Sequence, residues 1–417
     1  MRILHVVHQF PPDRIGGTEL YTLGLSEDLM RRGHQVAVFH RAPGSPGLAH
    51  ADWEGVPVYR ACAGPMTPVS VYRSSFGQPV LTRAFQQAVE HFRPELIHVQ
   101  HLKGLPASVV RLAQDQRIPL ICTLHDYWSV CANAQLLTNY DRTICSGPRN
   151  GATNCARCAI AMLDRPASAL ALPLVAALMV WRNILLARAL RSASVMIAPT
   201  EFVRHWFVAQ GWPKDRIQVI PHGIEPPATG IGRPSRPGDG VRVAYVGGLS
   251  WQKGVHALVQ ALNGLQGAQL WIAGDETFDP TYVSRLRSLA SPNVRFLGKL
   301  SREKVWATLA QVDVVAVPSL WYETFSLILH EAFAAGIPVI ASDLGALSEA
   351  IRHGEDGWLV APGDVEAWKA ALVRLVKEPE HLSHVQANVQ APVTQEEHVN
   401  RMEDLYTHAM GSQGGAP

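Results

Sequence analysis

The stretch "VDVVAVPSLWYETFSLILHEAFAAGIPVIASD" (residues 312–343) decides the fold of this chain. It contains an apolar run, a longer segment with helical spacing and a second apolar run, an order typical of a strand–helix–strand unit with parallel strands. Glu323 and Glu331 stand eight positions apart in the middle segment. We expect both on one helix, where about 1.5 Å of rise per residue separates the two carboxylates by roughly 12 Å along the axis and leaves them within about 80° of the same side.

A ligand lying along this helix would meet one carboxylate at each of its ends. A nucleotide sugar has those proportions. The amides of the helix N-terminus, at Thr324, Phe325 and Ser326, would face its diphosphate because the helix dipole favours negative charge there. The plain alternative is two solvated glutamates on an amphipathic helix. The context argues against it, because Glu331 precedes "AFAAG" and a strand, which makes the helix a buried crossover, and buried acids are seldom unpaired.

Apolar runs alternate with helical patterns from one end of the chain to the other, which indicates repeated strand–helix units. The expected strands are residues 2–7, 35–40, 96–100, 120–125, 194–199, 241–247, 269–274, 294–298, 312–318 and 338–343. A Gly- and Pro-rich stretch without periodicity, residues 222–240, is typical of a linker. The predicted fold class is therefore α/β, with two Rossmann-like, doubly wound parallel-sheet domains over 1–222 and 223–393. They would face each other across a cleft, with ligands at the carboxyl ends of the strands.

The end of the chain predicts one more helix. Thr394 is followed three residues later by Glu397, a capping box that opens a helix over 394–410. The remaining residues, 411–417, are expected to be disordered.

Two glycine-containing loops follow predicted strands. In "GGLSWQKG", Gly247 and Gly248 allow the backbone to approach an anion, and Lys253 stands at the start of the next helix; the alternative is a solvated lysine. In "FPPDRIGGTEL", Gly16 and Gly17 leave room for a substrate; the alternative is a plain turn. The second loop is not G-x-G-x-x-G, and strand 35–40 ends in a histidine rather than an acid, so a dinucleotide cofactor is disfavoured.

Histidines stand at the carboxyl ends of two further strands. "TLHDYW" carries His125 and Asp126, and "VQHLKG" carries His101. Each of them has a structural alternative as a satisfied core histidine. His222, in "IPHGI", is expected to be a hinge residue.

These motifs, in this order, resemble the retaining GT-B glycosyltransferases of family 4. The resemblance extends along most of the chain and is most specific at "ETFSLILHE". It implies that Glu323 contacts the donor sugar, Glu331 the ribose hydroxyls and Lys253 the diphosphate, and that His125 hydrogen-bonds the transferred sugar. It also implies that the final helix packs back on the first domain.

The resemblance further assigns the residues that flank the donor and the acceptor. It places Gly16 and Gly17 between the donor phosphate and the acceptor, with Asp126 and His101 on the acceptor side. The donor-binding positions that it implies are Gly248, Gly274, Ser319, Leu320, Thr324, Phe325 and Ser326. Gly248 departs from the family, which usually carries an arginine there. The resemblance also implies that the reaction retains anomeric configuration and uses no metal at the diphosphate and no other catalytic cofactor. In keeping with this, no D-x-D-like pair stands where a divalent ion would be needed.

Four of the six cysteines, Cys131, Cys145, Cys155 and Cys158, fall in a segment dense in Gly, Pro, Asn and Arg. Four thiolates complete a tetrahedral zinc site, with the C-x-x-C pair expected in a tight turn, and such a site would order a polar insertion over 131–158. An iron–sulfur cluster also fits four cysteines, and unconnected thiols or disulfides are the plain alternative. A cysteine-bearing insertion at this point occurs in some family members. The other two, Cys62 and Cys122, are expected in the core.

Composition limits the partners. The 37 basic and 35 acidic side chains give a net charge of +2, which is no footprint for nucleic acid. The most apolar stretch is residues 166–190, but its uncharged part, residues 166–181, is shorter than the roughly 20 residues that span a bilayer. It predicts either an amphipathic helix on a membrane surface, with Arg182 and Arg188 at the headgroups, or an internal helix.

The expected location is the cytoplasm, at the inner face of the membrane if that helix binds lipid. The expected reaction moves a sugar from a UDP- or GDP-sugar to a glycan or lipid-linked acceptor in bacterial surface polysaccharide or glycolipid synthesis. Two other functions fit the same scaffold: a nucleotide-sugar 2-epimerase and a non-catalytic nucleotide-sugar-binding subunit.

Overall fold

The computed structural model describes residues 1–13, 16–162, 171–227 and 240–411. The chain divides into two compact units: unit 1 is Met1–Pro221 with Glu396–Pro417, and unit 2 is His222–Gln395. The boundaries expected from the sequence, after 222 and after 393, lie one and two residues from these. Most of the expected linker (228–239) and nearly all of the expected disordered tail (412–417) lie outside the described residues.

Unit 1 is built on an eight-stranded sheet with the order β3-β4-β2-β1-β5-β6-β7-β8. Every neighbouring pair is parallel except β3 and β4. The strands are β1 (Arg2–Val7), β2 (Gln35–Ala42), β3 (Gly47–Trp53), β4 (Val56–Cys62), β5 (Leu96–Val99), β6 (Leu120–Thr123), β7 (Val195–Ala198) and β8 (Ile217–Val219). The chain runs from β1 to one side and returns to β5 on the other, so the strand order reverses between β1 and β5.

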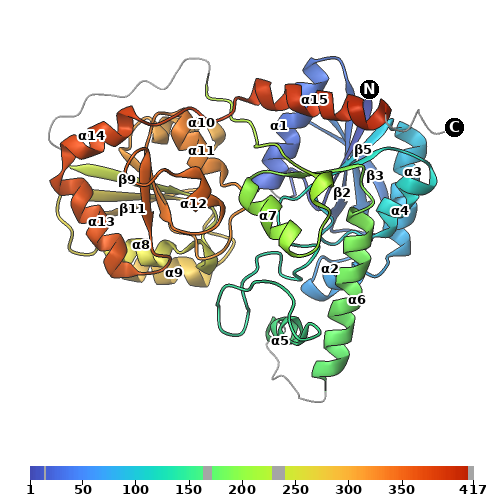
Figure 1. Ribbon diagram of the computed structural model, residues 1–417, viewed down its shortest axis with the longest axis horizontal. Coiled ribbons are helices and arrows are strands. Elements are labelled where there is room, and N and C mark those ends of the chain that lie inside the picture. The colour runs from blue at the N-terminus through green and yellow to red at the C-terminus, as the bar shows by residue number, and fades with distance from the viewer. Residues whose placement is uncertain (14–15, 163–170, 228–239, 412–417) are drawn as a thin grey trace. The chain divides into compact units, whose positions relative to one another are not determined.

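The helices of unit 1 connect these strands, and the last one closes the unit. They are α1 (Gly17–Arg31), α2 (Pro68–Ser74), α3 (Pro79–Phe92), α4 (Ser108–Asp115), α5 (Thr153–Ala161), α6 (Leu172–Leu190), α7 (Glu201–Ala209) and α15 (Gln395–Gly411). As predicted, α15 packs on the first domain. Met402 and Tyr406 share a buried cluster with Ile3 of β1 and Leu25 of α1, and α15 lies beside α1 in Figure 1.

Unit 2 contains a six-stranded, fully parallel sheet with the order β11-β10-β9-β12-β13-β14. The strands are β9 (Val241–Val246), β10 (Ala268–Ala273), β11 (Val294–Gly298), β12 (Val314–Val317), β13 (Val339–Ser342) and β14 (Gly357–Val360). The helices are α8 (Val255–Leu262), α9 (Pro280–Leu289), α10 (Arg302–Leu309), α11 (Leu327–Ala334), α12 (Ala346–Ala350), α13 (Val365–Lys377) and α14 (Pro379–Ala387). Its strand order reverses between β9 and β12.

The unit 2 strands read as continuous apolar runs because both faces of the sheet are covered. Successive residues of β12 enter different cores: Val314 packs with Leu270 and Trp368, whereas Val315 packs with Leu329 and Ile337. An alternating strand of a half-exposed sheet would not have this composition.

The sequence-based prediction missed four strands: β3 and β4, with seven residues each, and the shorter β8 and β14. The β3–β4 hairpin turns at Glu54 and Gly55, which both have positive φ (52° and 84°). Asn-Gly and Asp-Gly are the pairs that mark such a turn in a sequence, and Glu-Gly is a weaker marker. The Asp52 carboxylate accepts the Gly55 amide at 2.9 Å and supplies the missing local support.

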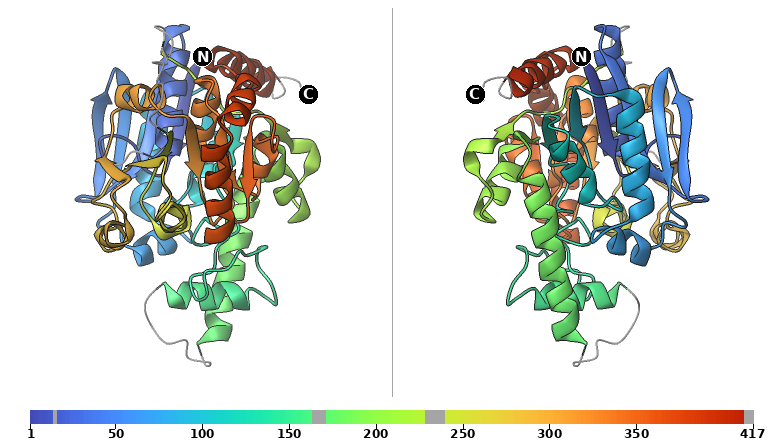
Figure 2. Two further views of the ribbon diagram at one scale, coloured as in Figure 1. Left: turned by 90° about the vertical axis from the view of Figure 1, so that its left-hand side faces the viewer. Right: turned by 90° about the vertical axis from the view of Figure 1, so that its right-hand side faces the viewer.

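The insertion after β6 leads into two helices that extend beyond the sheet of unit 1. Both views in Figure 2 show α6 running away from the strands, with α5 beside the far end of α6. By length and composition, α6 is apolar enough to cross a membrane, with a mean hydropathy of 1.4. Residues 166–170 of the predicted 166–190 segment lie outside the described residues.

Candidate active site

The carboxyl ends of β9 and β12, where the sheet order of unit 2 reverses, carry the strongest cluster of predicted residues. Ligands bind at such switch points in open parallel sheets. Glu323 follows β12 but is not on a helix, because α11 begins only at Leu327. Ser326 has a left-handed backbone (φ 68°), which starts the helix late. The prediction that Glu323 and Glu331 share one helix, with a regular axial separation, is therefore wrong.

Three donors converge on one oxygen of Glu323. The Ser319 hydroxyl donates to Oε1 at 2.6 Å, the Lys253 ammonium at 2.8 Å and the Trp321 indole N–H at 3.0 Å. Glu323 is only 7% exposed, yet its second oxygen, Oε2, takes no hydrogen bond from any residue that the structure describes. The Lys253 ammonium also lies 5.2 Å from the centre of the Trp321 ring. This arrangement fixes the carboxylate and leaves Oε2 able to accept a ligand hydroxyl.

Tight backbone packing brings Lys253 to Glu323. Lys253 ends a short 3-10 turn, and Gly254 follows with φ 69°. A Cβ at Gly254 would come within 1.9 Å of the Pro318 carbonyl oxygen, so only glycine allows this approach. The Leu320 amide donates to the Gln252 carbonyl at 2.8 Å, which joins the two loops. Gly254 is thus a positioning residue that the sequence motif contained but did not single out.

The two predicted donor-site glycines have different surroundings. Gly248 is exposed, and a Cβ there would meet no atom within 4 Å. A Cβ at Gly274 would lie 2.3 Å from the Gly247 carbonyl oxygen. Gly248 therefore borders open space, whereas Gly274 lets the ends of β9 and β10 pack closely.

Glu331 lies on α11, is 4% exposed and forms an ion pair with Arg302, Nη2 to Oε1, at 2.7 Å. Arg302 begins α10 and keeps 47% of its side chain exposed. The sequence reasoning missed this partner, because nothing in the spacing links residues 302 and 331. The buried acid is neutralised by a cation that remains open to solvent.

The start of α11 is held by stacked rings. Phe325 is buried and stacks on His330, with ring centres 3.8 Å apart and planes 4° apart. His222 also contacts Phe325, at 4.7 Å between ring centres; the sequence suggested only a hinge role for it. Burial lowers the pKa of His330 to about 4. His330 is therefore neutral, and its Nδ1–H donates to the Ser326 carbonyl at 3.0 Å.

In unit 1, the predicted histidines gather at the ends of β5 and β6. His101 Nε2 lies 2.6 Å from Asp126 Oδ2, and the Lys103 amide donates to His101 Nδ1 at 2.9 Å. His101 therefore carries its proton on Nε2 and donates it to Asp126. The other Asp126 oxygen accepts the Trp128 amide at 2.8 Å. Two side chains that sequence reasoning placed only loosely together form a fixed acid–imidazole pair.

His125 is held by a residue that the sequence analysis missed. Its Nε2–H donates to Gln100 Oε1 at 2.8 Å, and burial lowers the pKa of His125 to about 3. The Gln100 amide donates in turn to His5 and His98, each at 3.0 Å. His125 is consequently a neutral imidazole with a defined orientation.

The predicted glycine loop lies at the start of α1. Gly16 is its N-cap, Gly17 its first residue, and a Cβ at Gly16 would lie 2.7 Å from Glu19 Oε2. Glu19 is buried, 3.4 Å from His8 Nδ1, and burial raises the pKa of Glu19. The His8 ring lies 4.2 Å from that of His101. The buried Glu19 and the partly buried His8 are further titratable groups that no motif indicated.

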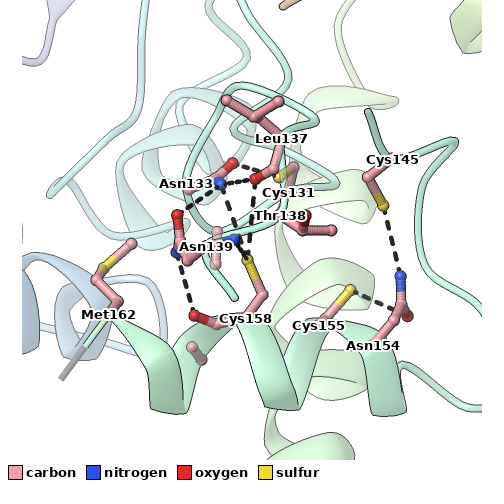
Figure 3. A pocket seen from close by; sticks show the side chains of 12 residues that line it. Cys131, Asn133, Leu137, Thr138, Asn139, Cys145, Asn154, Cys155, Cys158 and Met162 are labelled. Carbon is pink, nitrogen blue, oxygen red and sulfur yellow. Dashed lines mark hydrogen bonds between the residues drawn. The ribbon is translucent and has the colours of Figure 1, made fainter. Parts of the chain in front are cut away.

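The four clustered cysteines line one cavity of unit 1, with Asn133, Asn139 and Asn154 among its walls (Figure 3). Cys155 and Cys158 lie on α5, so the prediction of a tight turn for the C-x-x-C pair is wrong. Burial raises the pKa of both thiols to about 12.

All six cysteines of the chain are free thiols. Across the described ranges, no group of three or more His, Cys, Asp or Glu side chains is already arranged to hold a metal ion. Of the two cysteines expected in the core, Cys122 is buried, but Cys62 is half-buried at the carboxyl end of β4.

Comparisons with known proteins agree with this architecture. The profile described as Glycosyltransferase Family 4 matches residues 15–226, and the profile described as Glycosyl transferases group 1 matches residues 240–378. A glycogen synthase of Mycobacterium tuberculosis is 29% identical over 409 residues, which cover 91% of this chain and 87% of that protein. A phosphatidyl-myo-inositol mannosyltransferase of Mycobacterium leprae is 28% identical over 384 residues, covering 87% and 84%.

Solved structures show the same fold at lower identity. Sucrose-phosphate synthase from Thermosynechococcus elongatus superposes with a TM-score of 0.71 at 22% identity, covering 99% of both chains. Anabaena HepE, solved with UDP and glucose, gives a TM-score of 0.69 at 20% identity, covering 98% of this chain and 100% of that one. Since the two profiles match both units and the first alone covers half of the sequence, the chain belongs to glycosyltransferase family 4 and is a glycosyltransferase of the GT-B fold.

Proposed function

We propose that the enzyme transfers a sugar, with retention of anomeric configuration, from a nucleoside-diphosphate sugar to a glycan or lipid-linked acceptor. The observation that carries the proposal is the convergence of Lys253, Ser319 and Trp321 on one oxygen of Glu323 at the switch point of unit 2. The Lys253 ammonium can bind an anionic group of a ligand, and the Glu323 Oε2 atom can accept a hydrogen bond from a hydroxyl group of the same ligand. HepE, which shares the fold, was solved with UDP and with UDP-glucose.

Each group has a chemical task in this proposal. Lys253 stabilises the charge that develops on the leaving diphosphate, an interaction that strengthens in the transition state. Glu323 Oε2 accepts a sugar hydroxyl and favours positive charge at the anomeric carbon. The exposed backbone at Gly248 and the amides that precede α11 offer further donors to the phosphates.

Glu331 is proposed to bind the ribose diol. The ion pair with Arg302 fixes the orientation of the Glu331 carboxylate. The half-exposed Arg302 guanidinium can stay bound to Oε1 while Glu331 Oε2 accepts a ribose hydroxyl. In unit 1, neutral His125 is proposed to orient the transferred sugar, and the His101–Asp126 pair to contact the acceptor. No metal at the diphosphate is required by this scheme, because Lys253 supplies the positive charge.

Ligand binding to the full chain tests the donor site directly. A panel of UDP, GDP, ADP and their sugars should raise the melting temperature with one base preferred, because a ligand that binds only the native state stabilises it. Lys253→Ala should weaken the preferred diphosphate by about 10- to 100-fold, the range for a charge-assisted hydrogen bond. Lys304→Ala, which removes an exposed lysine of α10, is the matched control. A flat panel, or equal affinity in both variants, would contradict the proposal.

The products separate glycosyl transfer from the two rival functions. An epimerase would convert the sugar of the preferred donor without any acceptor, and NMR of the mixture would detect this. A non-catalytic subunit would bind donor but release no sugar to any acceptor, including water. Retention is read from the anomeric configuration of the product.

We further propose that α6 holds unit 1 against the inner face of the cytoplasmic membrane. Its exposed stripe contains Leu174 (68% exposed), Trp181 (52%) and Ile184 (43%), with Arg188 exposed at its end. The helix Leu172–Leu190 contains no acidic residue. An apolar stripe with an indole and a cation suits an anionic bilayer surface. The opposite stripe, with Met179, Arg182 and Leu186, is buried in unit 1. The expectation that Arg182 lies at the headgroups is therefore wrong, and Arg188 is the arginine of the pair that remains exposed.

Vesicle co-sedimentation tests the membrane contact. The enzyme should bind vesicles that contain phosphatidylglycerol, and Trp181→Glu should reduce the bound fraction by about tenfold, because a buried apolar contact is replaced by a charge that the lipid repels. Phe278→Glu, at an exposed aromatic residue of unit 2 (61%), is the control and should bind as the wild type does. If Trp181→Glu bound the vesicles as well as Phe278→Glu does, the proposed membrane contact of α6 would be wrong. Acceptors from surface polysaccharide or glycolipid synthesis would then be tested in soluble form.

A further inference from the structure

The cysteine cavity of unit 1 is independent of the donor site and has no task in the reaction described above. Cys131 and Cys145 approach it from the loop after β6, while Cys155 and Cys158 approach from α5 (Figure 3). Its volume of about 30 Å³ exceeds the roughly 10–15 Å³ that one water needs. Such a space suits a single ion rather than a multinuclear cluster.

Hydrogen-bond donors lie close to two of the four sulfur atoms, those of Cys145 and Cys158. The Asn139 backbone amide lies 3.3 Å from Cys158 Sγ, and the Asn154 side-chain amide lies 3.5 Å from Cys145 Sγ. The Asn133 amide reaches Cys158 Sγ at 3.8 Å. Donors to sulfur favour the thiolate over the thiol, and the thiolate is the form that binds metal.

A buried cation, Arg182, also favours a negatively charged centre at the cysteine cluster. Arg182 of α6 is fully buried, and its guanidinium donates to the Trp128 carbonyl at 2.7 Å and to Asn183 Oδ1 at 2.8 Å. It also lies 4.0 Å from the Trp128 ring centre, but it forms no salt bridge with a carboxylate in the described parts of the chain. A buried charge without a counter-ion is strongly unfavourable. The neighbouring Asn183 side chain donates to the Val130 carbonyl at 3.0 Å, so this part of α6 lies against the residues that immediately precede Cys131.

The backbone of the insertion has little regular secondary structure to stabilise it. Between β6 and α5 the chain forms no helix or regular strand, only an isolated bridge between Leu137 and Ile144. Several non-glycine residues of this segment adopt positive φ, a backbone region that residues other than glycine rarely occupy. They are Ala134, Leu136, Arg142, Asn150 and Ala152. Bound zinc contributes folding free energy directly to such segments.

We propose that Cys131, Cys145, Cys155 and Cys158 bind one Zn²⁺ as a tetrathiolate, with Arg182 as its buried counter-charge. Four thiols lose four protons, so the zinc centre carries a charge of −2 that Arg182 reduces to −1. The sulfur atoms do not yet form a coordination shell, so binding draws the loop that carries Cys131 and Cys145 onto α5. The zinc is structural, because all four positions are filled by protein ligands.

Elemental analysis of the full-length enzyme, purified without a metal-affinity step, tests the site. We expect about one zinc per chain, released by a thiol-modifying reagent and detected with a zinc-binding dye. Cys155→Ser should lower the zinc content to well below one, whereas Cys62→Ser, at a half-buried thiol outside the cluster, should leave it unchanged. Cobalt substituted for zinc should give the sulfur-to-metal charge-transfer bands of a tetrathiolate site. No bound metal in the wild type, with either four free thiols or two disulfides by mass spectrometry, would overturn the proposal; so would iron with acid-labile sulfide.

The counter-charge makes a separate prediction. Arg182→Met should weaken zinc binding by about 10- to 100-fold, as expected when a supporting residue of a metal site is lost, and Arg182→Lys should recover part of the loss. Arg188→Met, at an exposed arginine on the same helix, should have no effect. Zinc affinity is measured by competition with a chelator. If both Arg182 variants bind zinc as the wild type does, or if removing zinc from the wild type leaves its melting temperature unchanged, the assigned role is wrong.

Discussion

The Glu323 carboxylate shows how one residue is prepared for a ligand. Three donors on Oε1 replace the solvent that burial removes, and they include the charged Lys253. The carboxylate therefore remains an acceptor at Oε2 without a cost of reorganisation when a sugar arrives, which is the condition for electrostatic stabilisation of a transition state.

Replacing Glu323 with glutamine should remove the negative charge while keeping the shape. We expect kcat to fall by about 10²- to 10³-fold, the range seen when one stabilising group is lost, with a small change in KM. The melting temperature without ligand should change little, because Ser319 and Trp321 retain an acceptor. Glu331→Gln is the matched control, and its main effect should be on KM for the donor. A Glu323→Gln enzyme with near-normal kcat would exclude the proposed role.

At the scale of the element, α15 completes unit 1. Polar contacts add to its apolar face. Tyr406 lies 2.7 Å from His98 Nδ1, and His398 joins Tyr21 at 3.0 Å and the Pro221 carbonyl at 2.7 Å. These buried bonds join a helix at the end of the chain to the first strands and helices, so unit 1 cannot be complete until the last residues have been added.

Met402→Ala should measure this contribution. Met402 is fully buried, and truncating a buried methionine costs about 2–5 kcal/mol. The midpoint of urea unfolding should fall by the corresponding amount in the transition that reports unit 1, followed by tryptophan fluorescence. Met410→Ala, at the partly buried end of the same helix, should cost less than half as much. Equal effects would mean that α15 is not anchored through Met402.

For the whole molecule, buried histidines set the dependence of stability on pH. Burial lowers the pKa of His5 and His125 to about 3 and that of His40, His330 and His398 to about 4. Their unfolded pKa is about 6.5, so between pH 6.5 and 4 the unfolded chain binds more protons than the native one. The contribution of these histidines to the free energy of unfolding is therefore complete above pH 6.5 and is lost as the pH falls.

We therefore expect the melting temperature to drop steeply between pH 6.5 and 4.5. Each such histidine adds a slope approaching about 1.4 kcal/mol per pH unit. Glu19, whose pKa burial raises, acts in the opposite direction but is one group against several. His398→Gln should reduce the number of protons taken up on unfolding by nearly one, and the slope of the free energy of unfolding against pH should fall accordingly. Calorimetry across this pH range measures both quantities. The exposed His205→Gln should not change it, and a melting temperature independent of pH would contradict the assignment.

Much of the architecture follows from local patterns. The apolar runs predicted ten of the fourteen strands that the described residues form, because strands covered on both faces need continuous Val, Ile, Leu and Ala. The hairpin of β3 and β4 was missed because its turn depends on a Glu-Gly pair and on a contact from Asp52. The predicted start of α11 was wrong because the left-handed backbone conformation of Ser326 cannot be inferred from the spacing of hydrophobic residues.

Periodicity and motif spacing are local properties, so the amino-acid sequence was enough to predict the two parallel-sheet units and the family, and to propose a set of site residues. Only the tertiary structure decided which residues meet. Lys253 reaches Glu323, Gln100 orients His125, Arg302 neutralises Glu331, and the buried Arg182 donates to the Trp128 carbonyl, just before Cys131 in the chain. These partners are far apart along the chain. They meet because parallel strands bring their carboxyl ends to one edge of each sheet and because a buried charge must find an opposite one.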